Sequence, residues 1–273
     1  MNVRTLIAVV LVVGGFFLLY SLGTALTNVS FFSGGADVSG RIDVERLSAR
    51  AALIADADSG GILAEKNADT AYPMASVTKL FIAHIAHKPQ YIDRPVQIVW
   101  QDYVTEGGAG GLWLGEYYTI RKLLFPLLLA SSNDASAAIV RTIGRVQVDE
   151  ELATLYRVVG LASTNIEDAA GLKDTNRASA RDLATFVSYL DKEDRYVLDI
   201  TTLHTHLGTY RGLINNNPAR SFDEFAGGKH GYTPRAGRTF AGMFKTDQRE
   251  YIVVLLGSND LEADLEFIVP RLP

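Results

Sequence analysis

The 273-residue chain contains no cysteine. This absence excludes a disulfide framework, a thiol nucleophile and cysteine-ligated metal sites. The net charge of -5 comes without a basic block, so the sequence lacks the electrostatic footprint of a nucleic-acid-binding protein. Hydrophobic residues make up 48% of the chain and charged residues 21%, a globular rather than a disordered composition. The length suits one large domain or two small ones.

Charge is also absent from the amino-terminal segment. No charged residue occurs between Thr5 and Ala36, and residues 6–26 are mostly Leu, Val, Ile, Phe, Ala and Gly. Such a run reaches the roughly 20 residues that span a bilayer core, whereas the apolar part of a signal peptide is typically about 7 to 15 residues long. We therefore expect residues 1–27 to be a membrane anchor or signal segment, and the run length favours an uncleaved transmembrane helix.

The flanks of this segment predict its orientation. Arg4 indicates that the amino terminus stays in the cytoplasm, so the rest of the chain is expected to be extracytoplasmic. That location is the periplasm or the outer face of the cytoplasmic membrane. The small residues Gly23-Thr24-Ala25 leave a cleaved signal open.

The remaining chain reads as a linker followed by one folded domain. Serine and glycine are frequent after residue 28, which predicts a linker over 28–45 and a domain over 46–273. Strand patterns at both ends of the domain, with helical patterns between them, predict an α+β fold. We expect one antiparallel sheet formed by both ends, flanking helices, and an inserted all-helical lobe over about 100–190, with the active site in the cleft between. Expected helices span 76–87, 120–130, 135–143, 148–159, 180–190 and 260–269; expected strands span 51–55, 62–64, 232–233, 240–244 and 251–256.

The first candidate catalytic motif is Ser76-Val77-Thr78-Lys79. A serine three residues before a lysine at a helix start places the hydroxyl and the amine one turn apart on one face. A lysine that is desolvated or close to another cation has a lowered pKa and can accept the serine proton. The same pattern is also that of a helix N-cap followed by a solvated lysine, so it does not decide the function alone.

Two further motifs follow in the chain. Ser131-Ser132-Asn133 lies at a polar corner between two expected helices, and Lys229-His230-Gly231 lies just before the returning strands. We expect Gly231 to let a ligand approach the backbone closely. Ser-x-x-Lys, Ser-x-Asn and Lys-x-Gly in this order form the triplet of penicillin-binding proteins and class A beta-lactamases.

With these motifs the sequence resembles the D-alanyl-D-alanine carboxypeptidases of serine peptidase family S11, the low-molecular-mass penicillin-binding proteins. The likeness covers about residues 50–257 and includes Ala170-Gly171-Leu172, the run Ala178 to Ala184, and Gly231 to Gly237. It implies a beta-lactamase/transpeptidase-like fold and a penicillin-sensitive hydrolase that trims D-alanine from peptidoglycan stem peptides through an acyl-enzyme. Beta-lactams would be covalent inhibitors, and no cofactor or metal is implied.

The resemblance also implies a role for each motif residue. Ser76 would be the nucleophile, Lys79 the general base and Ser131 a proton relay. Asn133 would bind the substrate amide and hold the lysine, and Lys229 would lower the pKa of Lys79 by its charge. The remaining implied contacts are an oxyanion hole made of the Ser76 and Tyr232 backbone N–H groups, and substrate binding by Lys229, His230 and Gly231.

His230 departs from the family pattern, which usually has threonine at this position. The threonine hydroxyl contacts the terminal carboxylate of the substrate or of a beta-lactam. Histidine is larger, and we expect its charge to change near neutral pH. Substrate range and beta-lactam affinity are therefore open. Family members often continue into a beta-rich carboxy-terminal domain, whereas this sequence ends at Pro273, so we expect the amino terminus to provide the anchor.

Other functions remain open from the sequence. A D,D-endopeptidase would use the same residues, and a class A-like beta-lactamase would need a glutamate such as Glu167 to activate water. A catalytically silent peptidoglycan- or beta-lactam-binding protein is the non-enzymatic alternative, which His230 favours. We expect solvated or core roles for the pairs His84/His87 and His204/His206, because no glutamate accompanies the first pair as in His-Glu-x-x-His. Trp100 and Trp113 either line the cleft or pack in the core.

Overall fold

A computed structural model describes residues 42–103, 110–206 and 213–273. The predicted anchor over 1–27, most of the predicted linker over 28–45 and most of the glycine-rich stretch over 106–111 lie outside these residues. Across the described ranges, we find no helix with both the length and the apolar character needed to cross a bilayer. The chain divides into Met1–Phe31 and Phe32–Pro273, and the fold below is that of the second unit.

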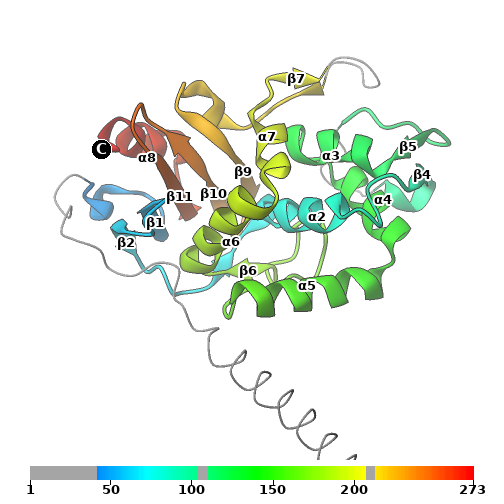
Figure 1. Cartoon of the computed structure of the whole chain (residues 1–273), viewed down its shortest axis with the longest axis horizontal. Coiled ribbons are helices and arrows are strands. Elements are labelled where there is room, and N and C mark those ends of the chain that lie inside the picture. Colours follow the sequence, from blue (N-terminus) through cyan, green and yellow to red (C-terminus); the bar gives the residue numbers. More distant parts are fainter. Residues whose placement is uncertain (1–41, 104–109, 207–212) are drawn as a thin grey trace, which may run out of the picture. The chain divides into compact units, whose positions relative to one another are not determined.

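A five-stranded antiparallel sheet joins the two ends of the domain in the order β2-β1-β11-β10-β9 (Figure 1). The predicted α+β class and the predicted sharing of one sheet by both ends are therefore confirmed. Strand β9 lies at the sheet edge and carries the Lys229-His230-Gly231 motif. The strands are β1 (Ala51–Asp56), β2 (Ile62–Lys66), β9 (Phe225–Thr233), β10 (Gly237–Lys245) and β11 (Glu250–Ser258).

Side chains on the central strands alternate between two hydrophobic cores. Leu53 and Val254 face the larger core, whereas Ile54 and Val253 face the smaller one. This follows from the two-residue period of a strand, and residues 51–55 and 252–256 are all apolar because both faces of the sheet are covered. Helix α6 (Ala180–Glu193) contacts β1, β10 and β11, and α8 (Leu261–Ile268) contacts β10 and β11.

Helix α2 (Thr78–His87) is the centre of the helical part, and all of its residues but His87 are buried. It contacts α3 (Ile120–Leu129), α4 (Asn133–Ile143), α5 (Arg145–Val159) and α7 (Arg195–Thr202). The sequence did not predict α7, which packs against β9. Short strand pairs complete the fold: β3 (Tyr72–Pro73) with β6 (Arg177–Ala178), β4 (Pro95–Gln97) with β5 (Tyr117–Thr119), and β7 (Thr205–His206) with β8 (Leu213–Ile214).

Polar side chains and a glycine cap the helix ends. Thr119 caps α3 by accepting a hydrogen bond from Lys122 N, and Gly160 ends α5 with a φ of 82°. At α8 the N-cap is Asp260, whose carboxylate accepts a hydrogen bond from Ala263 N. Ser179 caps α6 by accepting a hydrogen bond from Asp182 N. The Asp182 carboxylate accepts hydrogen bonds from Ser163 N and Thr164 Oγ1.

Candidate active site

Ser76 lies in a single 3-10 turn, η2 (Ala75–Val77), and not in the first turn of the α-helix that the sequence predicts. Ala75 has a φ of 49°, a left-handed conformation that is strained for a residue with a Cβ. The turn is held from both sides. Thr239 Oγ1 donates to Met74 O at 3.0 Å, and Met74 N donates to Asn176 O at 2.9 Å. The sheet and the segment before α6 therefore fix the position of Ser76, the candidate nucleophile.

The amine of Lys79 is the meeting point of three segments. Its Nζ lies 2.9 Å from Ser76 Oγ, 2.8 Å from Asn133 Oδ1 and 2.6 Å from the carbonyl oxygen of Ala170. The lysine is fully buried, with no solvent-exposed surface. The predicted one-turn spacing of Ser76 and Lys79 and the predicted hold of Asn133 on the lysine are present in the geometry.

These contacts determine which partners of a neutral Lys79 amine accept its hydrogens and which one donates to its lone pair. Burial lowers the pKa of Lys79 to about 7, and the carboxylate of Asp168 opposes that change. A neutral amine has two N–H groups and one lone pair. The Asn133 and Ala170 oxygens can only accept hydrogen bonds, so they take the two N–H groups and leave the lone pair to accept the Ser76 proton. Burial, and not the predicted charge of Lys229, is the main cause of the lowered pKa.

The Ser131-Ser132-Asn133 corner turns sharply between α3 and α4. Ser131 has a φ of 57°, and the buried Ser132 caps α4 by accepting a hydrogen bond from Ala135 N. Because α4 begins at Asn133, the amide is presented directly to Lys79. Gly110, at the end of the glycine-rich stretch, packs so closely here that a Cβ would lie 2.6 Å from Pro126 Cβ.

Lys229 and Gly231 bring the edge strand β9 against the nucleophile turn. Lys229 is 1% exposed and its Nζ donates to the His230 carbonyl oxygen at 2.7 Å. Burial first, and then the charge of Lys79, lower its pKa well below the usual value. A Cβ on Gly231 would lie 2.5 Å from Ser76 N. The glycine thus admits the nucleophile turn itself, where we predicted the approach of a ligand.

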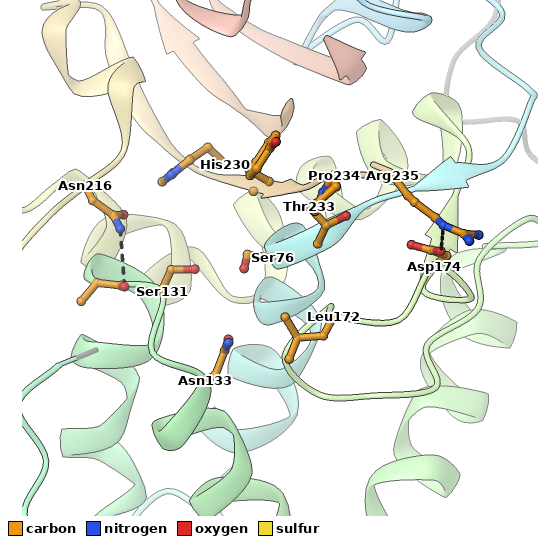
Figure 2. A pocket seen from close by; sticks show the side chains of 13 residues that line it. Ser76, Ser131, Asn133, Leu172, Asp174, Asn216, His230, Thr233, Pro234 and Arg235 are labelled. Carbon is orange, nitrogen blue, oxygen red and sulfur yellow. Dashed lines mark hydrogen bonds and ion pairs between the residues drawn. The ribbon is translucent and has the colours of Figure 1, made fainter. Parts of the chain in front are cut away.

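His230 differs from the prediction in its protonation. Burial, followed by the charges of Lys229, Arg238 and Lys79, lowers the pKa of this histidine well below its usual value. The imidazole is therefore neutral at neutral pH, and the predicted change of charge near neutrality is wrong. Its Nδ1 is buried and has no hydrogen-bond partner among the described residues. Figure 2 shows the ring pointing from β9 toward the Asn216 side of the pocket.

A pocket of about 700 Å³ lies over these groups (Figure 2). Ser76, Ser131 and Asn133 line one side, and residues 230–235 line the other. Arg235 and Asp174 form an ion pair of 3.1 Å at the far end. Neither tryptophan lines this pocket, so the predicted role in the cleft is wrong. Trp100 is 73% and Trp113 49% exposed, so neither packs in the core.

Sequence reasoning missed part of the site. Ala170 contributes only its carbonyl oxygen, and the loop that carries it is organised by Asp168 and Asn176. The available signal was the pair of cap-type residues, Asp and Asn, on either side of Ala170-Gly171-Leu172.

The residues considered for other functions lie away from the pocket. Glu167 is exposed, forms an ion pair with Lys173 and accepts a hydrogen bond from Thr175 Oγ1 at 2.6 Å. His84 and His87 both bond through Nδ1 to the carboxylate of Asp194, at 2.7 and 2.6 Å. Within the part of the chain that the structure describes, no group of three or more His, Asp or Glu side chains could hold a metal ion.

Comparisons with known proteins agree with this geometry. A family model of peptidase S11, described as D-alanyl-D-alanine carboxypeptidase, matches residues 39–260. A D-alanyl-D-alanine carboxypeptidase of Mycobacterium tuberculosis is 26% identical over 231 residues, covering 81% of this chain and 79% of the relative. A solved D-alanyl-D-alanine carboxypeptidase of M. tuberculosis superposes with a TM-score of 0.78 at 24% identity, covering 88% and 95% of the two chains. Penicillin-binding protein D2 of Listeria monocytogenes, bound to cefotaxime, gives a TM-score of 0.73 at 25% identity over 82% and 97%.

Proposed function

The chain belongs to serine peptidase family S11, and on that premise we propose how its residues carry out the reaction. It is a serine-type D-alanyl-D-alanine carboxypeptidase that acts on the D-Ala-D-Ala ends of peptidoglycan peptides and binds beta-lactams. We propose that the reaction proceeds through an ester of Ser76. The observation that carries this proposal is the 2.9 Å contact between Ser76 Oγ and the amine of the fully buried Lys79.

Acylation begins with a proton transfer inside this pair. The Lys79 lone pair accepts the Ser76 proton, and Oγ attacks the carbonyl carbon between the two D-alanines. The backbone N–H groups of Ser76 and Tyr232 hold the resulting oxyanion, and each such donor typically lowers the barrier by about 2.7 to 4 kcal/mol. The close packing of Gly231 on Ser76 N supports this assignment, because it places β9 beside the nucleophile.

Collapse of the intermediate breaks the peptide bond and requires a proton on the leaving amine. In our proposal Lys79 returns the proton through the Ser131 hydroxyl, which lines the same pocket. Lys229, His230 and Gly231 contact the carboxylate of the departing D-alanine, while Asn133 bonds the substrate amide and keeps Lys79 in place. Water then attacks the ester, which releases the shortened peptide and restores Ser76.

The proposal is tested with the full-length chain and two reagents. We expect release of free D-alanine from an acyl-D-Ala-D-Ala peptide, and covalent labelling by a fluorescent penicillin. Both signals should disappear in Ser76→Ala and persist in the matched control Ser221→Ala, whose exposed hydroxyl donates to the Pro218 carbonyl outside the pocket. A folded parent chain that gives neither signal would instead be a silent binding protein.

The same assays, together with a cross-linked peptide dimer as substrate, separate the alternative hydrolases. Rapid penicillin turnover without D-alanine release would indicate a beta-lactamase, although Glu167 is exposed and engaged with Lys173 and Thr175. A cross-linked peptide dimer that is cut faster than the linear peptide would indicate a D,D-endopeptidase. Neither outcome would change the role that we propose for Ser76.

We further propose that residues 1–27 anchor the enzyme at the outer face of the cytoplasmic membrane. The support is the uncharged run between Thr5 and Ala36, with Arg4 just before it. The full chain should resist alkaline extraction from membranes, whereas a chain that begins at residue 28 should be extracted. Release of both chains would contradict an uncleaved anchor.

A further inference from the structure

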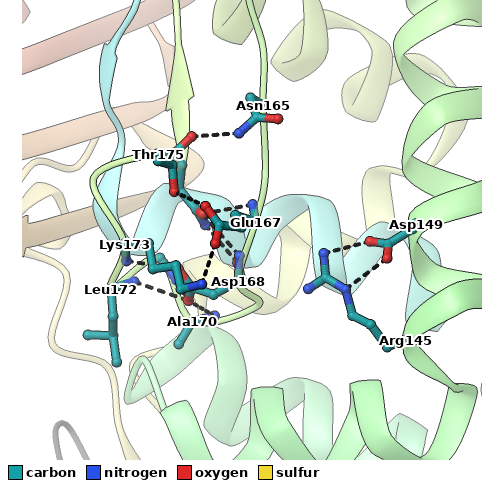
Figure 3. Close-up of polar contacts among 11 residues, drawn as sticks. Arg145, Asp149, Asn165, Glu167, Asp168, Ala170, Leu172, Lys173 and Thr175 are labelled. Carbon is teal, nitrogen blue, oxygen red and sulfur yellow. Dashed lines mark hydrogen bonds and ion pairs between the residues drawn. The ribbon is translucent and has the colours of Figure 1, made fainter.

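The loop that carries Ala170 is built around one carboxylate (Figure 3). Asp168 Oδ1 accepts hydrogen bonds from three successive backbone N–H groups, those of residues 170, 171 and 172, at 2.9, 2.7 and 3.1 Å. Its Oδ2 accepts a fourth from Lys173 N at 2.8 Å. Four backbone donors that converge on one carboxylate fix the direction of the peptide groups between them.

A second residue ties this loop to helix α2. The fully buried Asn176 donates to Asp168 O at 2.7 Å and to Thr78 Oγ1 at 3.2 Å, and its Oδ1 accepts from Asp168 N at 3.1 Å. Gly171 closes the contact on the other side, because a Cβ there would lie 2.0 Å from Ala75 O. The carbonyl of Ala170 consequently points at Lys79 Nζ, 2.6 Å away.

From these contacts we propose that Asp168 is a positioning residue for the reaction: its carboxylate folds residues 168–173 into the turn that holds the Ala170 carbonyl against the Lys79 amine. The inference rests on the proposed roles of Ser76 and Lys79. Asp168 itself does not contact the substrate in this proposal. Its effect on the reaction passes through the orientation of Ala170 and through its own negative charge.

The charge of Asp168 has a separate consequence for the base. Burial lowers the pKa of Lys79, and Asp168 raises it, so the value of about 7 is a balance between the two. Lys229 and His230 on β9 are the other titratable groups that sense Lys79, whose charge lowers the pKa of both. Removal of the Asp168 charge leaves the lowering of the Lys79 pKa by burial unopposed. The pKa of Lys79 should then fall.

The test compares pH profiles of kcat/KM for D-alanine release in three variants. Asp168→Asn keeps the size and removes the charge, Asp168→Glu keeps the charge and misplaces it, and Asn176→Ala removes the link to α2 and leaves the charge. Because Lys79 must be neutral to act as a base, activity rises with pH through its pKa. We expect Asp168→Asn to move this rise to lower pH by on the order of one pH unit. We expect plateau losses on the order of 10- to 100-fold in all three variants.

The position of the pH rise separates positioning from simple damage. A purely structural role would lower the rate of Asp168→Asn at every pH and leave the rise where it is in the parent, and that result would overturn the charge effect. A full plateau rate in Asp168→Asn would overturn the positioning role. Asp168→Glu should keep the rise near its parental position, so it provides the comparison if Asp168→Asn folds poorly.

A readout without turnover keeps this test independent of the proposed function. The amide hydrogens of residues 170–173 should exchange slowly in the parent and much faster in Asp168→Asn, with unchanged exchange in β10 and β11. Slow exchange in both chains would overturn the fold of the loop that we infer. A parent that neither releases D-alanine nor binds penicillin, but shows this exchange difference, would disprove the function and leave the positioning contact standing.

Discussion

At the residue scale, the base that we propose for this enzyme is a lysine that the fold removes from water. Lys79 is fully buried, and the oxygens around its amine come from a serine hydroxyl, an amide and a backbone carbonyl. None of these three partners carries a charge that would hold the ammonium form. Asp168 is the acidic group that acts on the lysine from further away. The site therefore combines good hydrogen bonding of the amine with weak stabilisation of its charge.

This combination predicts the pH dependence of acylation. With a Lys79 pKa of about 7, the rate of acylation by penicillin should be low at pH 5, rise through neutrality and level off near pH 9. The sign follows because only the neutral amine can accept the Ser76 proton. Lys79→Arg, whose guanidinium stays charged, should lose about 10²- to 10⁴-fold in rate. The exposed Lys245→Arg is the control, and a rate that falls with rising pH would contradict this role of Lys79.

His230 leads to a prediction about beta-lactam affinity. A neutral imidazole offers no charge to a carboxylate, whereas threonine would place a smaller hydroxyl donor beside Lys229. His230→Thr should therefore accelerate penicillin acylation at neutral pH by about tenfold, because a small hydroxyl hydrogen-bonds a carboxylate better than the bulkier neutral imidazole, and a hydrogen bond to a charged group contributes on the order of 1.5 kcal/mol or more. The measurement is the rate of fluorescent labelling, with His204→Thr outside the pocket as control. Unchanged or slower labelling would show that His230 does not limit carboxylate binding.

Most of the side chains that meet at the candidate site could be predicted from the sequence, because serine, lysine and asparagine each bring their own chemistry. The structure brings Ser76, Lys79 and Asn133 into direct contact. Ala170 could not be predicted in the same way, because it acts through a carbonyl that every residue has. The protonation of His230 was predicted wrongly for a related reason, since burial and neighbouring charges are properties of the fold.

At the scale of elements, strain is concentrated in the turns that present the reacting groups. Among the described residues, the non-glycine residues with positive φ are Asn67, Ala75 and Ser131. Two of these three flank the site, one next to the nucleophile and one at the Ser131-Ser132-Asn133 corner. Such conformations persist only where the surroundings enforce them. At Ala75 the enforcing contacts come from β10, from Asn176 and from the loop of Gly171.

Gly171 offers a direct test of this enforced geometry. Alanine there combines a φ of 83° with a Cβ 2.0 Å from the Ala75 carbonyl oxygen, so the nucleophile turn must shift. We expect penicillin labelling to fall by about 100-fold or more, in line with the effect of a misplaced reacting group. Gly160→Ala is a matched control, since it has a φ of 82° and nothing within 4 Å of the added Cβ. Equal labelling of the two variants would show that the close contact has no functional importance.

The elements that the sequence predicted well are long and apolar with a clear period, such as α2, α3 and β11. Strand β9 was predicted only at 232–233, because Gly227 and Gly228 are poor strand formers. In the structure the glycines are required by packing, since a Cβ on Gly228 would lie 2.4 Å from Gly242 Cα. Tertiary contact between strands thus overrides local propensity. The eight-residue α7 was missed for a similar reason, as it depends on packing against β9.

At the scale of the whole domain, the two walls of the pocket share one hydrophobic core. The larger core includes Leu53 of the sheet, Phe81 of α2 and Ile139 of α4. Phe81 stacks on Phe186 of α6 with ring centroids 3.8 Å apart, which links α2 to the helix that covers the sheet. No separate core of the helical part is present among the described residues. The sheet and the helices should therefore unfold together.

Phe81→Ala tests this cooperativity, because it removes a fully buried ring between the two walls. Truncation of a buried phenylalanine typically costs about 3 to 5 kcal/mol in the free energy of unfolding. If the domain is one unit, hydrogen exchange should accelerate by the same factor in α4 and in β10 and β11. Phe267→Ala is the control: its partly buried ring packs on the smaller core, so the loss should be smaller. Acceleration confined to the helices would show instead that the helical wall opens alone, and the pocket would then be a boundary between two folding units.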